Sequence, residues 1–445
     1  MFKRVTKAIA NQMDSTGDLI PVPSILDNEH FRPLCLVVRK RKTTFHPSPS
    51  YKQTWYRLED MLLPGEGDKS TELPFPSGGG EDSMQVTVQE STSDRMDGNL
   101  HLRVYSVSKE IKIAVSISKE LAIKTEKNHI TLQALDCLKI KRKINMNHSF
   151  IRQLQKTEQE LYVVHETIAA SEAASYEESI KGEGSFMIQL YAKFCAEGSR
   201  ERKQSITIPK GCTLAFKAIQ LAIMDRSWDL YYSSLSSKSL LASDGFSQGK
   251  LGEVEKEVKE NCHILSQLSS DLFIVFLKAI KAAMRDRNLF EELTRKMEAV
   301  LDETGSCELK TESPELKDLL SCLQNTSRHL LPQLAGAVTY TLDALDELTE
   351  DQLLLLLESL EEKIVSQQLK LVSSILKHGK GSFSVCARLL SFAQERQQKL
   401  TIAMVEMSGA KLRADGSALC PEEALPAIAA LCVSLYVLNL LSNSD

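Results

Sequence analysis

The chain has 445 residues, of which 42% are hydrophobic and 25% charged, and its formal net charge is −5. This length exceeds what one hydrophobic core ordinarily organises, so we expect two or three domains of a folded soluble protein. Ten cysteines are spread along the chain without a CxxC pair, and the first fifteen residues lack the apolar core of a secretory leader. These features exclude a disulfide-rich secreted domain, and we expect free thiols in the cytoplasm.

The first half of the chain is predicted to consist mainly of strands, preceded by one helix. Apolar residues recur at helical spacing within residues 1–13, whereas residues 84–89, 99–104 and 111–118 alternate apolar and polar side chains. Residues 186–194 alternate in the same way and predict a further strand. Strands with one polar face are not buried on both sides, so we expect an antiparallel sheet with one face in water or available for another environment.

A stretch rich in Ser and Gly, residues 236–252, separates this half from a half of different character. Beyond it, apolar residues recur at helical spacing, and the run Leu353–Leu357 is apolar around the whole circumference of its helix, which predicts burial. Residues 425–441 are apolar but slightly short for a membrane span, so we expect a buried C-terminal helix.

The sequence thus predicts an α+β protein with an N-terminal domain of twisted antiparallel sheet and short helices, followed by a C-terminal all-α helical bundle. We place the domains at residues 1–228 and 251–445, with a linker at 229–250. Residues 1–244 contain 33 basic and 30 acidic residues, a balance of +3, and residues 245–445 contain 21 and 29, a balance of −8. Opposite charges favour docking of the two halves.

Motifs of catalysis are missing from the sequence. It has no HExxH, GxSxG or GxxxxGK[ST] pattern, and the adjacent Cys262 and His263 would point about 100° apart on a helix. The Gly-rich residues 77–82 include acids that would repel a phosphate. We therefore expect neither an enzyme nor a cofactor or metal site.

Two basic runs, Arg39–Lys42 and Lys139–Lys143, are candidates for contact with an anionic partner. Three interpretations remain open: a solvated face, a nucleic-acid site, or an anionic membrane surface, near which each Lys or Arg contributes about 1 kcal/mol. The small charge of the first half and its lack of regularly spaced aromatic residues argue against nucleic acid.

Several stretches, in chain order, resemble the gasdermin family. The segments "GDLIPVPSILD", "FRPLCLVVRKRK", "ELYVVHET" and "ITIPKGCTLAFKAIQL" are similar to the pore-forming half of gasdermins. The segments "ALDELTEDQLLLLLESLEEKIVSQQLKLVSSIL" and "ALCVSLYVLNLL" are similar to the helical inhibitory half. The resemblance covers nearly the whole chain, and its first half is most similar to the gasdermin A subfamily.

This resemblance implies an autoinhibited cytoplasmic pore-former. A protease would cut the linker, and the N-terminal half would leave its inhibitor, the chain's own C-terminal domain. It would then bind phosphoinositides, cardiolipin or phosphatidylserine of the inner leaflet, form a homo-oligomer and insert into the plasma membrane as a β-barrel, causing pyroptosis. Alternating strands suit a barrel wall, whose spanning strands have about 9–11 residues with apolar side chains toward lipid. The inserting hairpins would come from residues 84–118 and 161–208.

The resemblance also assigns roles to individual residues. Phe45 would fill a pocket in the inhibitory half, although it could be an ordinary loop aromatic. Cys195, near the expected tip of the second hairpin, is a candidate for S-acylation or a free thiol. The cations implied in lipid contact are Lys3, Arg4, Lys7, Arg39, Lys40, Arg41, Lys42, Lys139, Lys141, Arg142, Lys143 and Arg152.

The activating cut is predicted at Asp244–Gly245, in "LASDG". A caspase requires Asp before the scissile bond, and Leu241 resembles what inflammatory caspases accept three residues before that Asp. A serine protease acting at Lys238 or Lys250, or a bacterial cysteine protease acting elsewhere in the linker, remains an alternative.

A second candidate cut, Asp97–Gly98 in "DRMDGN", has the DxxD pattern of executioner caspases. It lies between two alternating segments, where Asp-Gly also suits a hairpin turn. Cutting there would sever the first hairpin and inactivate the protein.

A different class of function also fits the sequence, namely a non-lytic cytosolic interaction protein that uses its C-terminal helical bundle. It predicts that the fragment 1–244 stays soluble beside acidic liposomes.

Overall fold

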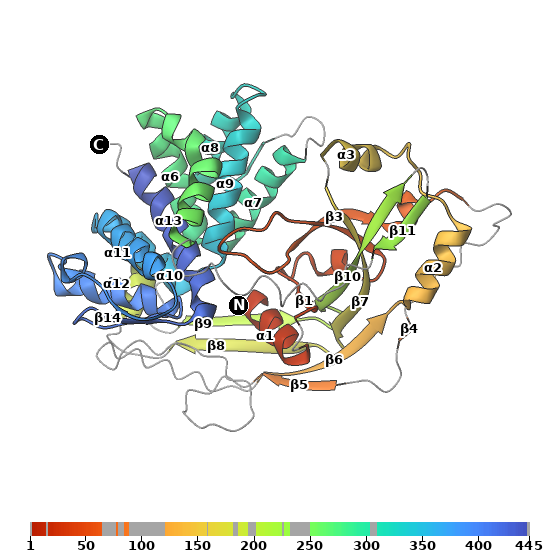
Figure 1. Ribbon diagram of the computed structural model, residues 1–445, viewed down its shortest axis with the longest axis horizontal. Coiled ribbons are helices and arrows are strands. Elements are labelled where there is room, and N and C mark those ends of the chain that lie inside the picture. Colours follow the sequence, from red (N-terminus) through yellow and green to blue (C-terminus); the bar gives the residue numbers. More distant parts are fainter. Residues whose placement is uncertain are drawn as a thin grey trace.

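The structure is a computed structural model. It describes residues 2–14, 17–64, 77–78, 84–88, 121–157, 159–180, 186–194, 202–224, 227–231, 250–302 and 309–442. A half rich in strands lies beside a half of packed helices, as Figure 1 shows.

The N-terminal half is built on a nine-stranded sheet in which neighbouring strands pair antiparallel, as expected. Its central order is β1-β10-β7-β2-β3; β11 pairs with β10, β6 pairs with β7, and β4 and β5 pair with β6. The strands are β1 (Ile20–Pro21), β2 (Cys35–Arg39), β3 (Tyr51–Arg57), β4 (Ser77–Gly78), β5 (Met84–Val88), β6 (Leu121–His129), β7 (Leu161–Ala170), β10 (Thr213–Met224) and β11 (Ser227–Tyr231).

Helices cover both faces of the centre of this sheet. They are α1 (Phe2–Met13), which forms as predicted, α2 (Leu132–Lys141) and α3 (Ser149–Thr157). Along β7, Tyr162 and Val164 share a core with α1, whereas Leu161 and Val163 share a second core with α2 and α3. The centre of the sheet, which does not include the alternating strands of the prediction, is therefore covered on both faces, because successive side chains of β7 enter two different cores.

The prediction of a strand at residues 186–194 is wrong. These residues form helix α4 (Phe186–Phe194), which follows β8 (Ala174–Ile180) and precedes its partner strand β9 (Arg202–Ile208). The segment is apolar at most positions, so it fits both a two-residue and a helical period. Met187, Leu190 and Phe194 fall on one helical face and are buried in the core of the C-terminal half, and this burial favours the helix.

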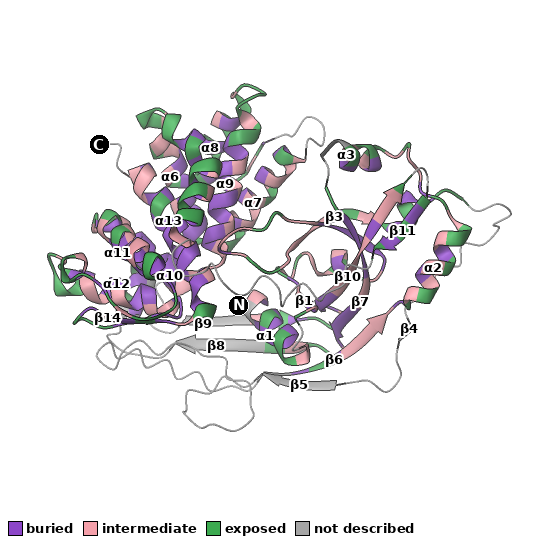
Figure 2. Ribbon diagram, viewed as in Figure 1, coloured by how far each residue is buried: buried purple, intermediate pink, exposed green. Residues whose placement is uncertain are grey.

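The C-terminal half packs its helices around α13, which is buried along most of its length (Figure 2). The helices are α5 (Lys250–Cys262), α6 (Ser270–Arg285), α7 (Arg287–Leu301), α8 (Pro314–Gln324), α9 (Leu331–Asp346), α10 (Glu350–Glu361), α11 (Val365–His378), α12 (Glu395–Met407) and α13 (Leu425–Ser442). The predicted burial of Leu353–Leu357 is confirmed. Among the described residues, Glu422–Ser442 is the one helical segment that is long and apolar enough to cross a membrane. Of its most apolar 18-residue stretch, 72% is buried inside this half.

We expected a C-terminal half of helices alone, but it also contains three short strands. A small antiparallel sheet joins β12 (Gly381–Ser384), β14 (Ser417–Cys420) and β13 (Lys411–Leu412). The turn before β14 requires Gly416, because its φ is +88° and a Cβ there would lie 2.7 Å from the carbonyl oxygen of Val385.

Strand β11 ends at Tyr231 and helix α5 begins at Lys250. Several predicted features lie outside the described residues: both candidate cuts, Asp244–Gly245 and Asp97–Gly98, the thiol of Cys195, and the strands expected at 99–104 and 111–118.

Candidate functional site

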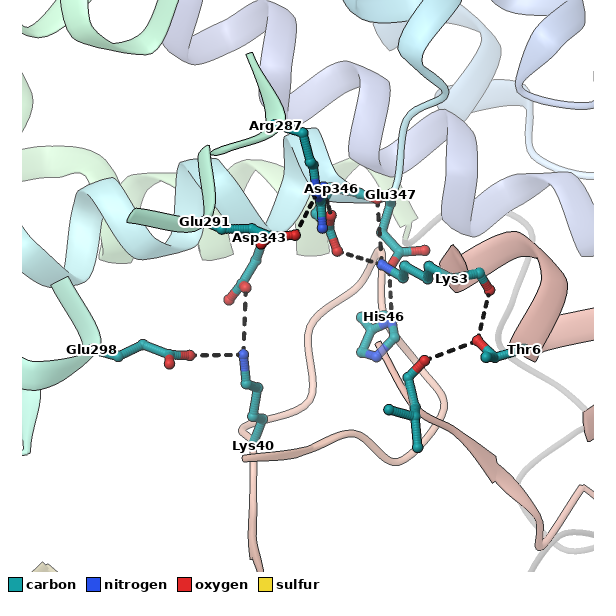
Figure 3. Close-up of polar contacts among 11 residues, drawn as sticks. Lys3, Thr6, Lys40, His46, Arg287, Glu291, Glu298, Asp343, Asp346 and Glu347 are labelled. Carbon is teal, nitrogen blue, oxygen red and sulfur yellow. Dashed lines mark hydrogen bonds and ion pairs between the residues drawn. The ribbon is translucent and has the colours of Figure 1, made fainter. Parts of the chain in front are cut away.

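The two halves meet where the N-terminal helix and the loop between β2 and β3 face acidic side chains of α7 and α9 (Figure 3). Lys3 Nζ of α1 lies 2.5 Å from Asp346 Oδ2 and 3.0 Å from Glu347 Oε1. Arg287 Nη1 donates to the other carboxylate oxygen of Asp346 at 2.7 Å. Asp346 therefore bridges one cation from each half of the chain.

A second group of ion pairs lies beside the first. Lys40 Nζ is 3.0 Å from Glu298 Oε1 and 3.9 Å from Asp343 Oδ1. Lys52 of β3 pairs with Asp302 and approaches the other oxygen of Glu298 at 4.0 Å. Each of these pairs joins a base of the N-terminal half to an acid of the C-terminal half.

The pKa values show how strongly these charges depend on one another. Burial alone would lower the pKa of Lys3, but the charges of Asp346 and Glu347 raise it above its usual value. Burial would raise the pKa of Asp346, but Lys3 and Arg287 hold it well below its usual range. Burial opposes ionisation of Glu347 as well, yet a hydrogen bond from His46 and the charge of Lys3 lower its pKa to about 2. These groups are stabilised in their charged forms by docking.

Asp343 behaves differently from its neighbours. Burial raises the pKa of Asp343, and the nearby Lys40 only partly offsets this effect. Glu298, in contrast, has a lowered pKa, because the charges of Lys40 and Lys52 outweigh its burial. Glu298 is therefore the principal anion for Lys40, in agreement with its shorter distance.

The loop between β2 and β3 also inserts an aromatic side chain into the C-terminal half. Phe45 is 2% exposed and belongs to the core of that half, where its ring meets Tyr340 edge-on with centroids 5.4 Å apart. The backbone amide of Thr44 donates to Glu257 Oε2 at 2.9 Å, and His46 Nδ1 lies 3.3 Å from Glu347 Oε1. The residues on both sides of Phe45 thus fix the loop on the C-terminal half.

Helix α4 makes a third contact with the C-terminal half. Lys193 Nζ lies 2.6 Å from Glu358 Oε2 and 2.5 Å from Glu361 Oε2. The side chain of Glu358 is only 1% exposed, and Arg396 binds its other carboxylate oxygen. The guanidinium of Arg285 lies 5.5 Å from the ring centroid of Phe194. Charge and apolar burial both attach α4 to α10 and its neighbours.

Most of the other predicted lipid-contact cations lie outside these ion pairs, although the charge of Lys7 helps to lower the pKa of Glu347. Arg39 is near Glu160 and Tyr162 within its own half, and Lys139 pairs with Asp136 and Asp229. Arg4 lies in α1, but its side chain is outside the described residues, and Arg142 is half-buried. Exposed residues are Lys7, Arg41, Lys42, Lys141, Lys143 and Arg152.

Sequence reasoning missed several residues of this interface. Lys52 and Lys193 are isolated bases outside the basic runs, and their acidic partners follow them by 165 or more positions. The only signal in the sequence was the difference in charge between the halves. Among the described residues, His, Cys, Asp and Glu form no group suited to a metal ion.

Comparison with known proteins identifies this arrangement. The family described as the gasdermin pore forming domain matches residues 1–239, and the gasdermin PUB domain matches residues 250–419. The chain belongs to the gasdermin family. The resemblance found in the sequence is thereby confirmed. This gasdermin has a pore-forming domain and a C-terminal autoinhibitory domain. The matching families and relatives do not indicate a catalytic family.

Its similarity to individual gasdermins extends over the whole chain. Human Gasdermin-A is 29% identical over 470 residues, covering 100% of both chains, and mouse Gasdermin-D is 28% identical, covering 99% of each. A cryo-EM structure of the Gasdermin A3 membrane pore is 26% identical, with a TM-score of 0.35, and covers 53% of this chain and 96% of that one.

Proposed function

We propose that this gasdermin is the autoinhibited precursor of a pore-forming protein, activated by proteolysis between its domains. An inflammatory caspase cuts Asp244–Gly245, and the N-terminal half separates from the C-terminal inhibitor. The freed half leaves the cytoplasm for the inner leaflet of the plasma membrane, where it binds phosphoinositides, cardiolipin or phosphatidylserine. Copies then assemble and insert as a β-barrel, because only a closed barrel satisfies the backbone of its strands in lipid, and pyroptosis follows.

The observation that carries this proposal is the double role of Lys3 and Lys40. Both are expected to contact lipid, and both are already bound by carboxylates of the C-terminal half. Lys3 directs its three donors at the two carboxylates and the backbone carbonyl of Asp346, and Lys40 donates to Glu298, so a lipid phosphate would have to displace these partners. Docking and full lipid binding therefore exclude each other.

The position of α4 supports the same order of events. Met187, Leu190 and Phe194 are buried in the core of the C-terminal half, and Lys193 is held by two of its acids. The second inserting hairpin, expected from residues 161–208, includes this helix. It cannot extend into a membrane until the C-terminal half has left.

Dye release from liposomes tests the proposal. The uncut chain, and the chain cut at a protease site inserted in the linker, are added to phosphatidylcholine vesicles with and without phosphatidylserine, cardiolipin or a phosphoinositide. We expect leakage only from the cut chain and only with acidic lipid. Intact acidic vesicles in the presence of the cut chain would refute the proposal and favour the non-lytic interaction protein.

The cleavage site is tested separately with Asp244→Ala and an inflammatory caspase. Loss of cleavage between the domains is expected, and continued cleavage would mean that another bond is used. The variant Asp97→Ala tests the inactivating cut, since it should preserve leakage after exposure to an executioner caspase.

A further inference from the structure

The loop between β2 and β3 carries the sequence pattern of a kinase substrate. Arg39 and Arg41 precede Thr44 by five and three residues, and the apolar Phe45 follows it. A guanidinium pairs with a carboxylate through two parallel hydrogen bonds, so kinases with acidic substrate grooves select arginines at fixed distances from the acceptor hydroxyl. This spacing makes Thr44 a candidate phosphate acceptor.

The neighbouring Thr43 lacks this pattern. Val38 and Lys40 stand five and three residues before it, and an ammonium has no planar fork to match a carboxylate. Lys40 is also bound in the docked molecule, with its Nζ 3.0 Å from Glu298 Oε1. Thr43 therefore provides a matched control for Thr44.

In the docked molecule a kinase cannot reach the hydroxyl group of Thr44. Its oxygen is buried and has no hydrogen-bond partner in the described part of the chain. The backbone amide of Thr44 donates to Glu257 Oε2 at 2.9 Å, and the adjacent Phe45 lies in the core of the C-terminal half. A kinase places the acceptor hydroxyl in its own catalytic cleft, so these contacts must break first. Thr44 is therefore accessible only when the halves are apart.

Acidic side chains of the C-terminal half line the docked loop, as Figure 3 shows around Lys40 and His46. A phosphothreonine carries a charge of about −1.5 to −2 at pH 7, and such a charge is unfavourable in an interface that buries it beside acids. The nearby cations Lys3 and Lys40 are already paired with carboxylates, so a phosphate on Thr44 would oppose docking. The acids in contact with residues 40–46 are Glu257, Glu298, Asp343 and Glu347.

We propose that Thr44 is a phosphorylation site of a serine/threonine kinase that selects basic substrates, and that this modification and docking of the halves exclude each other. In the reaction the hydroxyl oxygen of Thr44 bonds to the γ-phosphorus of ATP, while the bond from that phosphorus to the oxygen bridging the β- and γ-phosphates breaks. ADP leaves, and the hydroxyl proton passes to a carboxylate of the kinase. The phosphate marks chains whose halves have separated and keeps the halves apart. This modification takes the separation of the halves from the proposed function and requires neither a pore nor a lipid.

Phosphate transfer in the absence of membranes tests the site. The probe is the catalytic domain of protein kinase B, which selects arginine five and three residues before its acceptor, together with ATP. The initial rate is measured for the uncut chain and for the chain cut at a protease site inserted in the linker and diluted until the halves dissociate. Mass spectrometry locates each phosphate, because Arg200 and Arg202 give Ser205 the same spacing. Thermal melting verifies that every variant is folded.

We expect phosphate on Thr44 of the diluted cut chain, and it should persist in Thr43→Val and vanish in Thr44→Val. The uncut chain should react at least about 100-fold more slowly, because only its open fraction presents the hydroxyl. Asp346→Asn should speed the reaction of the uncut chain about tenfold, since a weaker interface raises the open fraction in proportion. Asp318→Asn, which removes a charge from an ion pair inside the C-terminal half, should leave the rate unchanged.

The reciprocal effect is measured on docking. Phosphate on Thr44 should raise the Kd between the halves of the cut chain at least about 100-fold, which reflects an uncompensated charge in a buried interface. The Thr44→Val chain, treated with the same kinase and ATP, is the control, and its Kd should not change.

Other outcomes overturn the proposal. The site is refuted if Thr44 of the diluted cut chain takes up no phosphate. Equal rates for the uncut and cut chains would refute the exclusion, as would an unchanged Kd after phosphorylation. If Thr44 remains unmodified while the cut chain releases dye from acidic vesicles, this site is wrong and the proposed function stands. If Thr44 is modified as expected and the cut chain releases no dye, the pore is wrong and the site stands.

Discussion

Replacing Asp346 by Asn is expected to weaken the attachment of the two halves. The substitution removes the negative charge that Lys3 contacts at 2.5 Å, in a pair whose side chains are 28% and 22% exposed. A hydrogen bond to a charged group contributes about 1.5–3 kcal/mol net. Because Glu347 remains 3.0 Å from Lys3, we take the lower end, about 1.5 kcal/mol, which is about tenfold in Kd.

The measurement uses the chain cut at a protease site inserted in the linker, without membranes, so that the halves form a non-covalent complex. The Kd of that complex is compared with that of Asp318→Asn, which removes the same charge from an Asp–Lys pair inside the C-terminal half, Asp318 Oδ2 with Lys278 Nζ at 2.8 Å. Asp346 also binds Arg287 within its own half, so a double-mutant cycle with Lys3→Met isolates the contact between the halves.

Equal dissociation constants for the Asp346→Asn complex and the original complex would refute this reasoning. So would a cycle with no coupling between Lys3 and Asp346, because the effect of the substitution would then belong to Arg287 alone.

Three further predictions concern the same interface. Glu347, whose pKa is about 2 in the docked state, and Asp346 and Glu298, whose pKa values are also lowered, stabilise the complex above the usual carboxylate pKa, and this stabilisation is lost as the pH falls below about 4.5. Asp343, whose pKa is raised, opposes the loss. The Kd of the cut chain at a series of pH values measures the sum of these four effects. Phe45→Ala should weaken docking by about 3 kcal/mol and cause the uncut chain to release dye from acidic vesicles. Phe45→Leu should retain most of the inhibition. Absence of dye release by the alanine variant would contradict a role of Phe45 in docking. Glu358→Gln should lower the melting temperature of the full chain more than Glu361→Gln, because the side chain of Glu358 is 1% exposed and that of Glu361 is 38% exposed.

Local periodicity predicted those elements whose partners are close in sequence or whose pattern fits one structure only. The spacing in residues 1–13 is helical and gives α1, and the alternation at residues 84–88 gives β5. Residues 186–194 fit two periods, so the choice between helix and strand depends on the distant core that receives Met187, Leu190 and Phe194. A pattern within nine residues contains no information about that core.

The sequence allowed us to predict interface residues of the N-terminal half, but not their partners in the C-terminal half. Phe45 and the basic run Arg39–Lys42 are recognisable in the sequence as unusual residues at one loop, whereas Asp346 and Glu358 are ordinary members of acidic helices. They become distinct only when folding places them 2.5–2.6 Å from Lys3 and Lys193, more than 160 positions away in the chain. The difference in charge between the halves indicated that such pairs exist and could not say which acids take part.

The two halves are joined by the 18 residues from 232 to 249, between Tyr231 and Lys250. The fraction of uncut chains in which the halves are docked therefore depends on the effective concentration of the tethered inhibitor relative to the Kd of docking. A short tether holds the inhibitor at an effective concentration of about a millimolar. Even a micromolar affinity would then keep about 999 molecules in 1,000 closed, whereas a severed pair at nanomolar abundance would be almost wholly dissociated. An interface of moderate affinity, built from a few ion pairs, Phe45 and the apolar face of α4, is therefore sufficient to keep the uncut chain closed, and it lets the two halves separate after the cut.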